Sequence, residues 1–295
     1  MAIDPFVFIM PTKERPKRLP PWFKVRLTTN ERFAAVRNLV RDNGLHTVCR
    51  SAACPNRNEC WNAGTATFMI LGNVCSRGCR FCNVPQGAPS GPDHGEPGRV
   101  ADAVAALHLS YAVVTSVTRD DLPDGGAGIF AETIRSIREK SPGCRVEVLI
   151  PDLQGSFESL GTVLDAFPDV LNHNLETVPS LYPRVRPQAD YGRSRELLKQ
   201  ARLSGAVTKS GLMLGLGESL SEVRVVMNDL RMTGCEILTL GQYLQPNKRA
   251  LSVEKYYHPD EFAQLKNEAL GLGFRQVVAG PLVRSSYHAG EYAMT

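Results

Sequence analysis

The feature that most constrains this 295-residue chain is a run of three closely spaced cysteines. Cys75, Cys79 and Cys82 follow a CxxxCxxC spacing, and Phe81 stands directly before the last of them. Three thiolates can hold three corners of a cubane [4Fe–4S] cluster and leave the fourth iron without a protein ligand. A structural zinc site would normally show CxxC pairs and four ligands. The spacing therefore predicts an iron–sulfur cluster whose open iron binds a small molecule.

A second cysteine triad lies directly upstream. Its members follow a CxxxxCxxxxxC spacing and are Cys49, Cys54 and Cys60. Six of the eight cysteines therefore lie between positions 49 and 82, which favours metal binding in a reducing compartment over a disulfide scaffold. Cys144 and Cys235 stand apart, each near a predicted strand, and we expect them to be buried as small apolar side chains.

A third motif, Arg284-Ser285-Ser286-Tyr287, stands near the C-terminal end. Together with the two triads it closely resembles the lipoyl synthase family of the radical S-adenosylmethionine (SAM) superfamily, over about residues 28 to 290. The resemblance implies that the cluster on the CxxxCxxC triad chelates the amino and carboxylate groups of SAM. It also implies that the upstream triad carries a second [4Fe–4S] cluster with a serine as its fourth ligand. The family pattern favours Ser286, while the residues alone leave Ser285 open.

The resemblance implies a sulfurtransferase with SAM and two [4Fe–4S] clusters as cofactors. Reductive cleavage of SAM gives a 5′-deoxyadenosyl radical, which abstracts hydrogen from an unactivated methylene. In the family, sulfur from the upstream cluster is inserted at C6 and C8 of a protein-bound octanoyl-lysyl group. Other sulfur-inserting radical SAM enzymes, such as biotin synthase or methylthiotransferases, lack the upstream triad. A ferredoxin-like carrier or a zinc module would need four ligands per cluster and no βα domain of roughly 200 residues.

The same resemblance implies three kinds of partner. They are octanoylated lipoyl carrier domains (the glycine cleavage H protein or the E2 component of a 2-oxoacid dehydrogenase), an electron donor such as ferredoxin or flavodoxin, and an iron–sulfur carrier for cluster repair. The basic run Lys13–Arg18 is interpreted as a solvated tail, with docking of an acidic partner as the alternative.

Charge and hydropathy limit the remaining partners. The net charge of +4 is too mild to indicate nucleic-acid binding. No run approaches the ~18 apolar residues of a membrane span, and the start of the chain lacks the basic region of a signal peptide. We therefore expect a cytoplasmic protein with neither nucleic acid nor membrane among its partners.

From Thr65 onward, short apolar runs alternate with amphipathic segments of helix length. Strands are expected at Thr65–Leu71, Tyr111–Ser116, Arg145–Ile150, Val170–Asn174, Thr208–Leu214 and Ile237–Leu240. Helices are expected at Arg99–Leu109, Ile129–Lys140, Phe157–Ala166, Arg193–Ser204, Leu220–Met232 and Asp260–Leu270. Because parallel strands need crossovers, six βα units predict a parallel sheet. The predicted fold class is α/β, a partial (β/α)6 TIM-like barrel of the radical SAM type with N- and C-terminal extensions.

The expected organisation has three parts. Residues 1–64 form an N-terminal extension, residues 65–275 the barrel, and residues 276–295 a C-terminal segment with the serine ligand. The extension begins with a proline-rich stretch, residues 1–27, that suits an extended arm. A capping box at Thr28–Glu31 predicts a helix to Asp42, after which the upstream triad sits in a loop. The active site is expected at the C-terminal ends of the strands.

Polar residues follow the predicted strands and are candidates for SAM contacts. Thr115 opens a polar stretch that resembles the family segment that binds the methionyl part of SAM, and its position at a strand end favours this role over an ordinary polar turn. Asn174 and Glu176 alternate outward and are expected at the ribose or the SAM amino group, whereas His173 is expected to be a hydrogen-bonded structural residue. Arg184 resembles the family arginine that pairs with the SAM carboxylate in a bidentate manner.

The stretch Gly211–Glu218 matches the GxIxGxxE motif of the superfamily, with Met213 at its apolar position. Glycines such as Gly215 let the backbone approach the adenine, and Glu218 is expected to anchor the turn. Taken alone the motif is weak, since glycine-rich turns are common in α/β proteins. Phe81 is expected to stack near the adenine, with a place in the core as the alternative.

Overall fold

The computed structural model describes residues 19–25 and 28–292. The predicted basic tail and the first ten residues lie outside this part of the chain. Within it, the 3-10 helix η1 (Pro21–Phe23) buries Phe23, whose ring lies 5.6 Å from that of Tyr256 between centroids. This portion of the predicted extended arm is therefore docked on the body of the protein.

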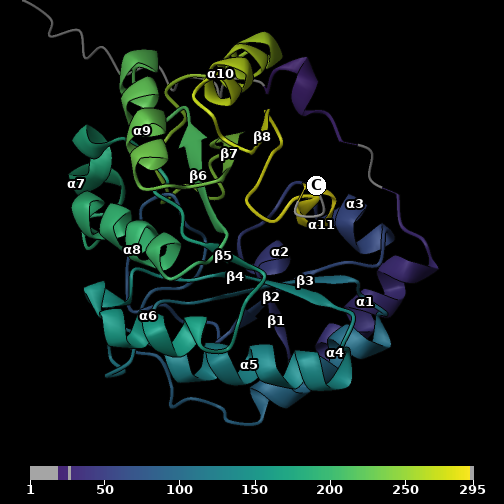
Figure 1. The fold of residues 1–295 in the computed structure, drawn as a ribbon. Coiled ribbons are helices and arrows are strands. Elements are labelled where there is room, and N and C mark those ends of the chain that lie inside the picture. Colours follow the sequence, from purple (N-terminus) through teal and green to yellow (C-terminus); the bar gives the residue numbers. More distant parts are fainter. Residues whose placement is uncertain (1–18, 26–27, 293–295) are drawn as a thin grey trace, which may run out of the picture.

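One eight-stranded sheet forms the centre of the molecule, with strand order β1 to β8 (Figure 1). The first two strands are antiparallel, and every later neighbour is parallel. The strands are β1 (His46–Thr47), β2 (Thr67–Ile70), β3 (Tyr111–Ser116), β4 (Arg145–Leu149), β5 (Val170–Asn172), β6 (Thr208–Leu214), β7 (Ile237–Gln242) and β8 (Gln276–Gly280). Since β1 and β8 stand at opposite ends of this order, the barrel is open.

The predicted α/β fold of the radical SAM type is confirmed, but the prediction of six strands was too low. The six expected strands correspond to β2 through β7, and β8 adds a seventh parallel strand. The run that forms β8 is only five residues long, and one of these residues is buried while the other four are half-buried. It therefore lacks the continuous apolar pattern that marks the central strands.

The longer helices lie around the outside of the sheet, as Figure 1 shows. They are α4 (Glu96–Ala106), α5 (Ala127–Lys140), α6 (Phe157–Leu164), α8 (Tyr191–Leu203), α9 (Leu220–Met232) and α10 (Pro259–Gly271). Each corresponds to an expected helix, with ends that move by up to three residues. The capping box of Ser219 and Glu222 begins α9, and Pro259 occupies the first turn of α10. Shorter elements are η2 (Leu153–Gly155), η3 (Pro179–Leu181) and α7 (Tyr182–Val185).

The N-terminal region differs from its prediction in two places. Helix α1 (Glu31–Asp42) ends where expected, but its N-cap is Asn30, whose side chain accepts the Phe33 amide at 2.9 Å, and not Thr28. The upstream triad also does not lie in a plain loop. Cys49 stands on α2 (Val48–Ser51) and Cys60 on α3 (Arg57–Asn62), so two short helices present these thiols.

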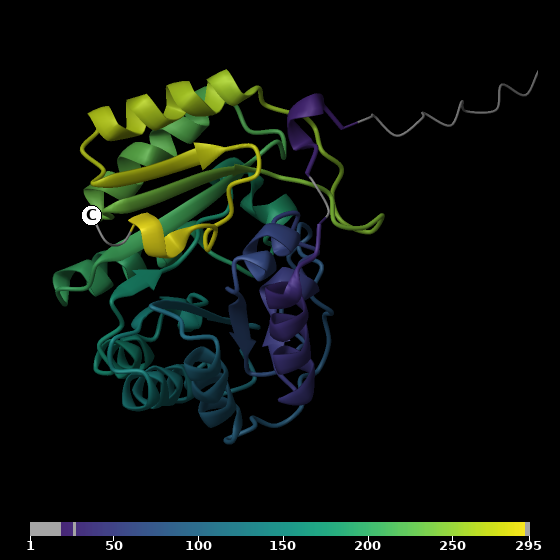
Figure 2. The ribbon, with the colours of Figure 1, turned by 90° about the vertical axis from the view of Figure 1, so that its right-hand side faces the viewer.

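The C-terminal segment returns to the inner side of the sheet. Figure 2 shows α10 on one side of β8 and the last helix, α11 (Ala289–Tyr292), on the other. Backbone approach is close there, because a Cβ added to Gly290 would stand 3.0 Å from Cβ of Tyr111 on β3. Between sheet and outer helices lies the apolar core, where Cys144 and Cys235 are buried as expected. No helix among the described residues is long and apolar enough to cross a membrane.

Candidate active site

A cavity of about 1140 Å³ lies along the inner side of the sheet and reaches residues at the C-terminal ends of the parallel strands. Residues from β2, β3, β6 and β7 all line it, so the sheet curves around this space. All six clustered cysteines line it as well, together with Phe81, Thr115, Asn174, Glu176 and Ser286. The structure therefore brings most of the predicted site residues to one cavity, at the edge of the sheet where the topology predicted it.

Backbone amides surround two sulfur atoms of the CxxxCxxC triad. Cys75 Sγ accepts the amides of Arg77 at 3.4 Å and Thr118 at 3.3 Å, and Cys82 Sγ accepts that of Val84 at 3.4 Å. Such donors orient cluster ligands and stabilise thiolate charge. Burial nevertheless raises the pKa of Cys82 to about 11, so this thiol ionises near pH 7 only beside a compensating positive charge. Bound iron would provide that charge.

Burial acts in the same way on a thiol of the upstream triad. Burial raises the pKa of Cys60 to about 12, and the nearness of Cys49, Cys54 and Glu59 adds to the rise. Within residues 19–25 and 28–292, no three His, Cys, Asp or Glu side chains converge as a single metal ion would require. Each triad offers three thiols, which is the donor set that a cubane iron–sulfur cluster takes, with each ligand on a different iron.

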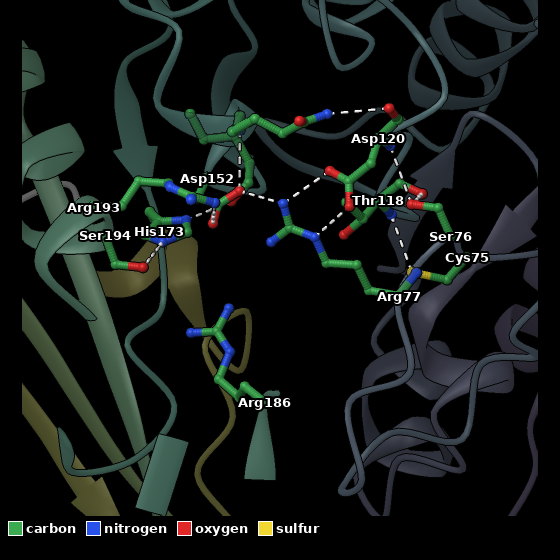
Figure 3. A network of polar contacts seen from close by, with 12 residues as sticks. Cys75, Ser76, Arg77, Thr118, Asp120, Asp152, His173, Arg186, Arg193 and Ser194 are labelled. Atoms are coloured by element: carbon green, nitrogen blue, oxygen red, sulfur yellow. Dashed lines mark hydrogen bonds and ion pairs between the residues drawn. The ribbon is translucent and has the colours of Figure 1, made fainter. Parts of the chain in front are cut away.

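A buried ionic network holds the CxxxCxxC loop against the sheet (Figure 3). The guanidinium of Arg77 bonds both carboxylate oxygens of Asp120, at 2.6 and 2.8 Å, and one oxygen of Asp152 at 2.7 Å. The side chains of Arg77 and Asp152 are 4% and 0% exposed. Because Asp120 follows β3 and Asp152 follows β4, the network fixes the loop between two cluster cysteines to two strand ends. Sequence reasoning missed Arg77, although it stands inside the motif.

His173 has the structural role expected of it. Its Nδ1 lies 2.8 Å from the carbonyl oxygen of Ile150, and its Nε2 lies 3.0 Å from the hydroxyl of Ser194. Burial lowers the pKa of His173 to about 4. The ring is therefore neutral near pH 7, with Nδ1 donating to the carbonyl and Nε2 accepting from the serine.

Asn174 and Glu176 lie together in the loop after β5. Asn174 Nδ2 donates to Glu176 Oε1 at 3.1 Å, and Asn174 Oδ1 accepts the hydroxyl of Ser285 at 2.7 Å. Burial raises the pKa of Glu176. The hydroxyl of Thr115 is engaged by the carbonyl of Leu149 at 2.9 Å. Thr115 thus shapes the cavity wall with its hydroxyl already bonded to the backbone.

The structure places Arg186, and not Arg184, at the cavity. Arg184 is half-exposed, pairs with Glu254 at 2.6 Å and does not line the cavity, so the expected pairing of this arginine with a SAM carboxylate lacks geometric support. Arg186 lines the cavity and is buried, and its Nη1 donates to the carbonyls of Asn174 and Leu175 at 3.0 and 3.1 Å. Its charge also opposes the rise that burial causes in the pKa of Cys79.

Glu218 anchors the glycine-rich turn after β6, as expected. Its two carboxylate oxygens accept the amides of Gly215 at 2.6 Å and Leu216 at 2.9 Å. Gly215 has φ +109°, and a Cβ there would stand 2.5 Å from the carbonyl oxygen of Lys255, so only glycine fits. Neither Gly215 nor Glu218 lines the cavity, which Gly211, Leu212 and Met213 reach instead. The expected approach of Gly215 to an adenine therefore has no support from the lining of this cavity.

Phe81 and the two serines complete the cavity wall. Phe81 packs against a small apolar cluster of Val185, Leu216 and Tyr243 while it faces the cavity, so both expected roles are compatible with its position. Ser285 and Ser286 both line the cavity. The Ser285 hydroxyl is bonded to Asn174, whereas that of Ser286 has no hydrogen-bond partner among the described residues.

Comparison with known proteins places the chain in a family. A model of the radical SAM superfamily matches residues 69–230. Lipoyl synthase from Bacillus subtilis (strain 168) is 54% identical over 285 residues, which cover 96% of each chain. Lipoyl synthase from Symbiobacterium thermophilum is 55% identical over 287 residues, which cover 96% of this chain and 90% of the relative.

Two solved structures share the fold at low sequence identity. Methylornithine synthase superposes with a TM-score of 0.53 at 12% identity and covers 86% of this chain and 82% of its own. Streptococcus suis SuiB bound to precursor peptide SuiA gives 0.56 at 10% identity, over 72% of this chain and 48% of its own. These likenesses concern the fold alone. Identity above one half along nearly the whole length shows that the chain belongs to the lipoyl synthase family of the radical SAM superfamily.

Proposed function

We propose that this chain forms lipoyl groups by inserting sulfur at C6 and C8 of a protein-bound octanoyl-lysyl group. The observation that carries the proposal is the single cavity lined by both cysteine triads and Ser286. A radical generated beside one triad could therefore act on a carbon chain that lies against the other, within the same cavity.

The CxxxCxxC side of the cavity would bind SAM. Cys75, Cys79 and Cys82 would hold the open cluster, which when bound supplies the electron that cleaves SAM to methionine and a 5′-deoxyadenosyl radical. Arg186 offers a buried cation for the SAM carboxylate, and Glu176 and Asn174 offer acceptors for the amino group or ribose. Phe81 lines the same side and would contact the adenine.

The upstream cluster, held by Cys49, Cys54, Cys60 and Ser286, is proposed as the sulfur-donating substrate. In each insertion a C–H hydrogen passes to the 5′-deoxyadenosyl radical and gives 5′-deoxyadenosine. The carbon radical then forms a C–S bond with a sulfide, and the spare electron reduces an iron of the donor. The bonds between that sulfide and its irons break as the sulfur leaves with the product, and a proton from solvent completes the thiol. Two insertions consume two SAM molecules and two electrons from an external donor.

The partners follow from this chemistry. We propose an octanoylated carrier domain, of the H protein or an E2 component, as the substrate. A ferredoxin or flavodoxin would supply the electrons, and an iron–sulfur carrier would rebuild the consumed cluster. A cytoplasmic location would give access to all of them.

The direct test is anaerobic incubation of the reconstituted protein with SAM, dithionite and an octanoyl-lysyl peptide. Mass spectrometry should show a peptide that has gained two sulfur atoms, with about two molecules of 5′-deoxyadenosine per product. Formation of 5′-deoxyadenosine without any sulfur-bearing peptide would refute the proposal, as would iron sufficient for only one cluster in active protein.

A further inference from the structure

The C-terminal segment is bonded to the helix that carries Cys60. The hydroxyl of Tyr287 donates to Oε1 of Glu59 at 2.8 Å, and Nε2 of His288 lies 3.0 Å from the same oxygen. These partners stand 228 and 229 positions apart in the sequence. Glu59 thus joins α3 to the C-terminal segment through one carboxylate oxygen.

The contact matters because its two partners are sequence neighbours of proposed cluster ligands. Glu59 directly precedes Cys60, and Tyr287 directly follows Ser286. A bond between the two neighbours limits how far the Ser286 hydroxyl can move from the Cys60 sulfur. The segment is also held at its other end, where the buried side chain of Asn56 donates to the carbonyl of Leu282 at 2.7 Å. Ser286 therefore stands between two attachments to the region that carries the upstream triad.

We propose that Glu59 is a positioning residue for the fourth ligand of the upstream cluster. It holds the Ser286 segment against α3, so that the hydroxyl is in place beside the three thiols. This inference rests on the proposed function, in which the upstream triad and Ser286 hold the sulfur-donating cluster. Glu59 itself touches no reacting atom.

The exposure of the contact sets the size of the expected effect. The side chains of Glu59 and His288 are 55% and 35% exposed, so global stability should change little when Glu59 is removed. Local opening of the short C-terminal segment costs far less free energy than global unfolding. A small loss of local stability can therefore be measured there by amide hydrogen exchange. We expect about a fivefold increase in opening, equivalent to about 1 kcal/mol.

The test uses the full chain and two matched variants, Glu59→Ala and Glu132→Ala. Glu132 is exposed on the outer helix α5, so its removal controls for loss of a surface carboxylate. Amide hydrogen exchange should be about fivefold faster in residues 283–291 of Glu59→Ala and unchanged in Glu132→Ala. Tyr287→Phe should accelerate exchange in the same residues, but by less than Glu59→Ala does. Exchange in the double variant Glu59→Ala/Tyr287→Phe should be only slightly faster than in Glu59→Ala, because both substitutions remove the same hydrogen bond.

A second readout isolates the upstream cluster. In a background in which Cys75, Cys79 and Cys82 are all alanine, iron release to a chelator reports the upstream cluster alone. Glu59→Ala should speed this release severalfold, and Glu132→Ala should not. Unchanged exchange in residues 283–291, or unchanged iron release, would overturn the inference. Failure of the proposed function would appear separately, as absence of sulfur-bearing product from the wild-type protein.

Discussion

The hydroxyl of Ser285 donates a 2.7 Å hydrogen bond to Oδ1 of Asn174, across 111 positions of sequence. This bond ties the C-terminal segment to the loop after β5, and Asn174 in turn donates to Glu176 at 3.1 Å. The next residue, Ser286, lines the same cavity as the upstream triad. The C-terminal segment therefore contributes two adjacent serines to this cavity, and one of them is bonded to the loop after β5.

Substitution of Arg186 should weaken SAM binding, whereas substitution of Arg184 should not. Arg186 lines the cavity, and a hydrogen bond to a charged partner contributes about 1.5–3 kcal/mol. The dissociation constant of SAM should rise about ten- to a hundredfold in Arg186→Gln and stay within about twofold in Arg184→Gln. Equilibrium binding to the reconstituted protein measures both. Equal losses of SAM affinity in the two variants would show that Arg186 does not contact SAM directly.

Arg77→Met should destabilise the protein strongly. Removing one partner of a buried ion pair leaves the other charge uncompensated, at a cost of about 3–5 kcal/mol. Asp152 keeps a contact with Arg193 at 3.3 Å, so the lower end of this range is expected. Arg41→Met is the control, because the Arg41–Asp42 pair is largely exposed and should contribute little to stability. Thermal unfolding should show a decrease in Tm on the order of 10 °C for Arg77→Met and little change for Arg41→Met.

Stability should depend on pH through His173. Burial lowers the pKa of this histidine from 6.5 to about 4, so below pH 6.5 the unfolded chain binds a proton that the folded chain does not. The stability that the neutral ring contributes is complete above pH 6.5 and is lost as pH falls toward 4, by up to about 1.4 kcal/mol per pH unit.

Urea unfolding of the metal-free wild type and His173→Gln, compared at several pH values in this window, isolates the effect. The stability difference between the two proteins should shrink as pH falls. A difference that stays constant with pH would show that His173 titrates normally.

The sequence located some elements to the residue and missed others for physical reasons. Strands β3 and β6 were predicted with their observed ends, because each is a run of mostly buried residues that is longer than most strands of this sheet. The N-cap of α1 was placed at Thr28 because both Thr28 and Asn30 are competent caps. Asn30 also bonds Asn62 through its amide at 3.1 Å, a tertiary contact that no local pattern records.

In the site, too, local patterns predicted some residues, whereas tertiary contacts decided others. Cysteine spacing located both triads, since ligand spacing along the chain is a local property. The choice between Arg184 and Arg186 depends on where α7 ends, and this helix stops at Val185. Arg186 then turns inward to the carbonyls of Asn174 and Leu175, which belong to a distant strand end. The role of Glu59 depends on the return of the C-terminal segment, which only the fold reveals.

Alanine variants should separate SAM cleavage from sulfur insertion. Cys75→Ala, Cys79→Ala or Cys82→Ala should abolish formation of 5′-deoxyadenosine, because the SAM-binding iron loses a ligand, while the upstream cluster remains. Cys49→Ala, Cys54→Ala or Cys60→Ala should still form 5′-deoxyadenosine but no sulfur-bearing peptide. Chromatography of the nucleoside and mass spectrometry of the peptide measure the two outcomes. Doubly thiolated product from an upstream variant would mean that the sulfur comes from elsewhere.

The two serines should respond differently to substitution. Ser286→Ala should retain much of the upstream cluster on three thiolates and should still cleave SAM, yet fail to complete sulfur insertion. Ser285→Ala should keep insertion and weaken SAM binding about two- to tenfold, because it removes the hydrogen bond that orients Asn174 and contributes about 0.5–1.5 kcal/mol. Both variants keep the segment length and the Glu59 contact, so each serves as the control for the other. Normal turnover in Ser286→Ala, with loss of insertion in Ser285→Ala, would move the fourth ligand to Ser285.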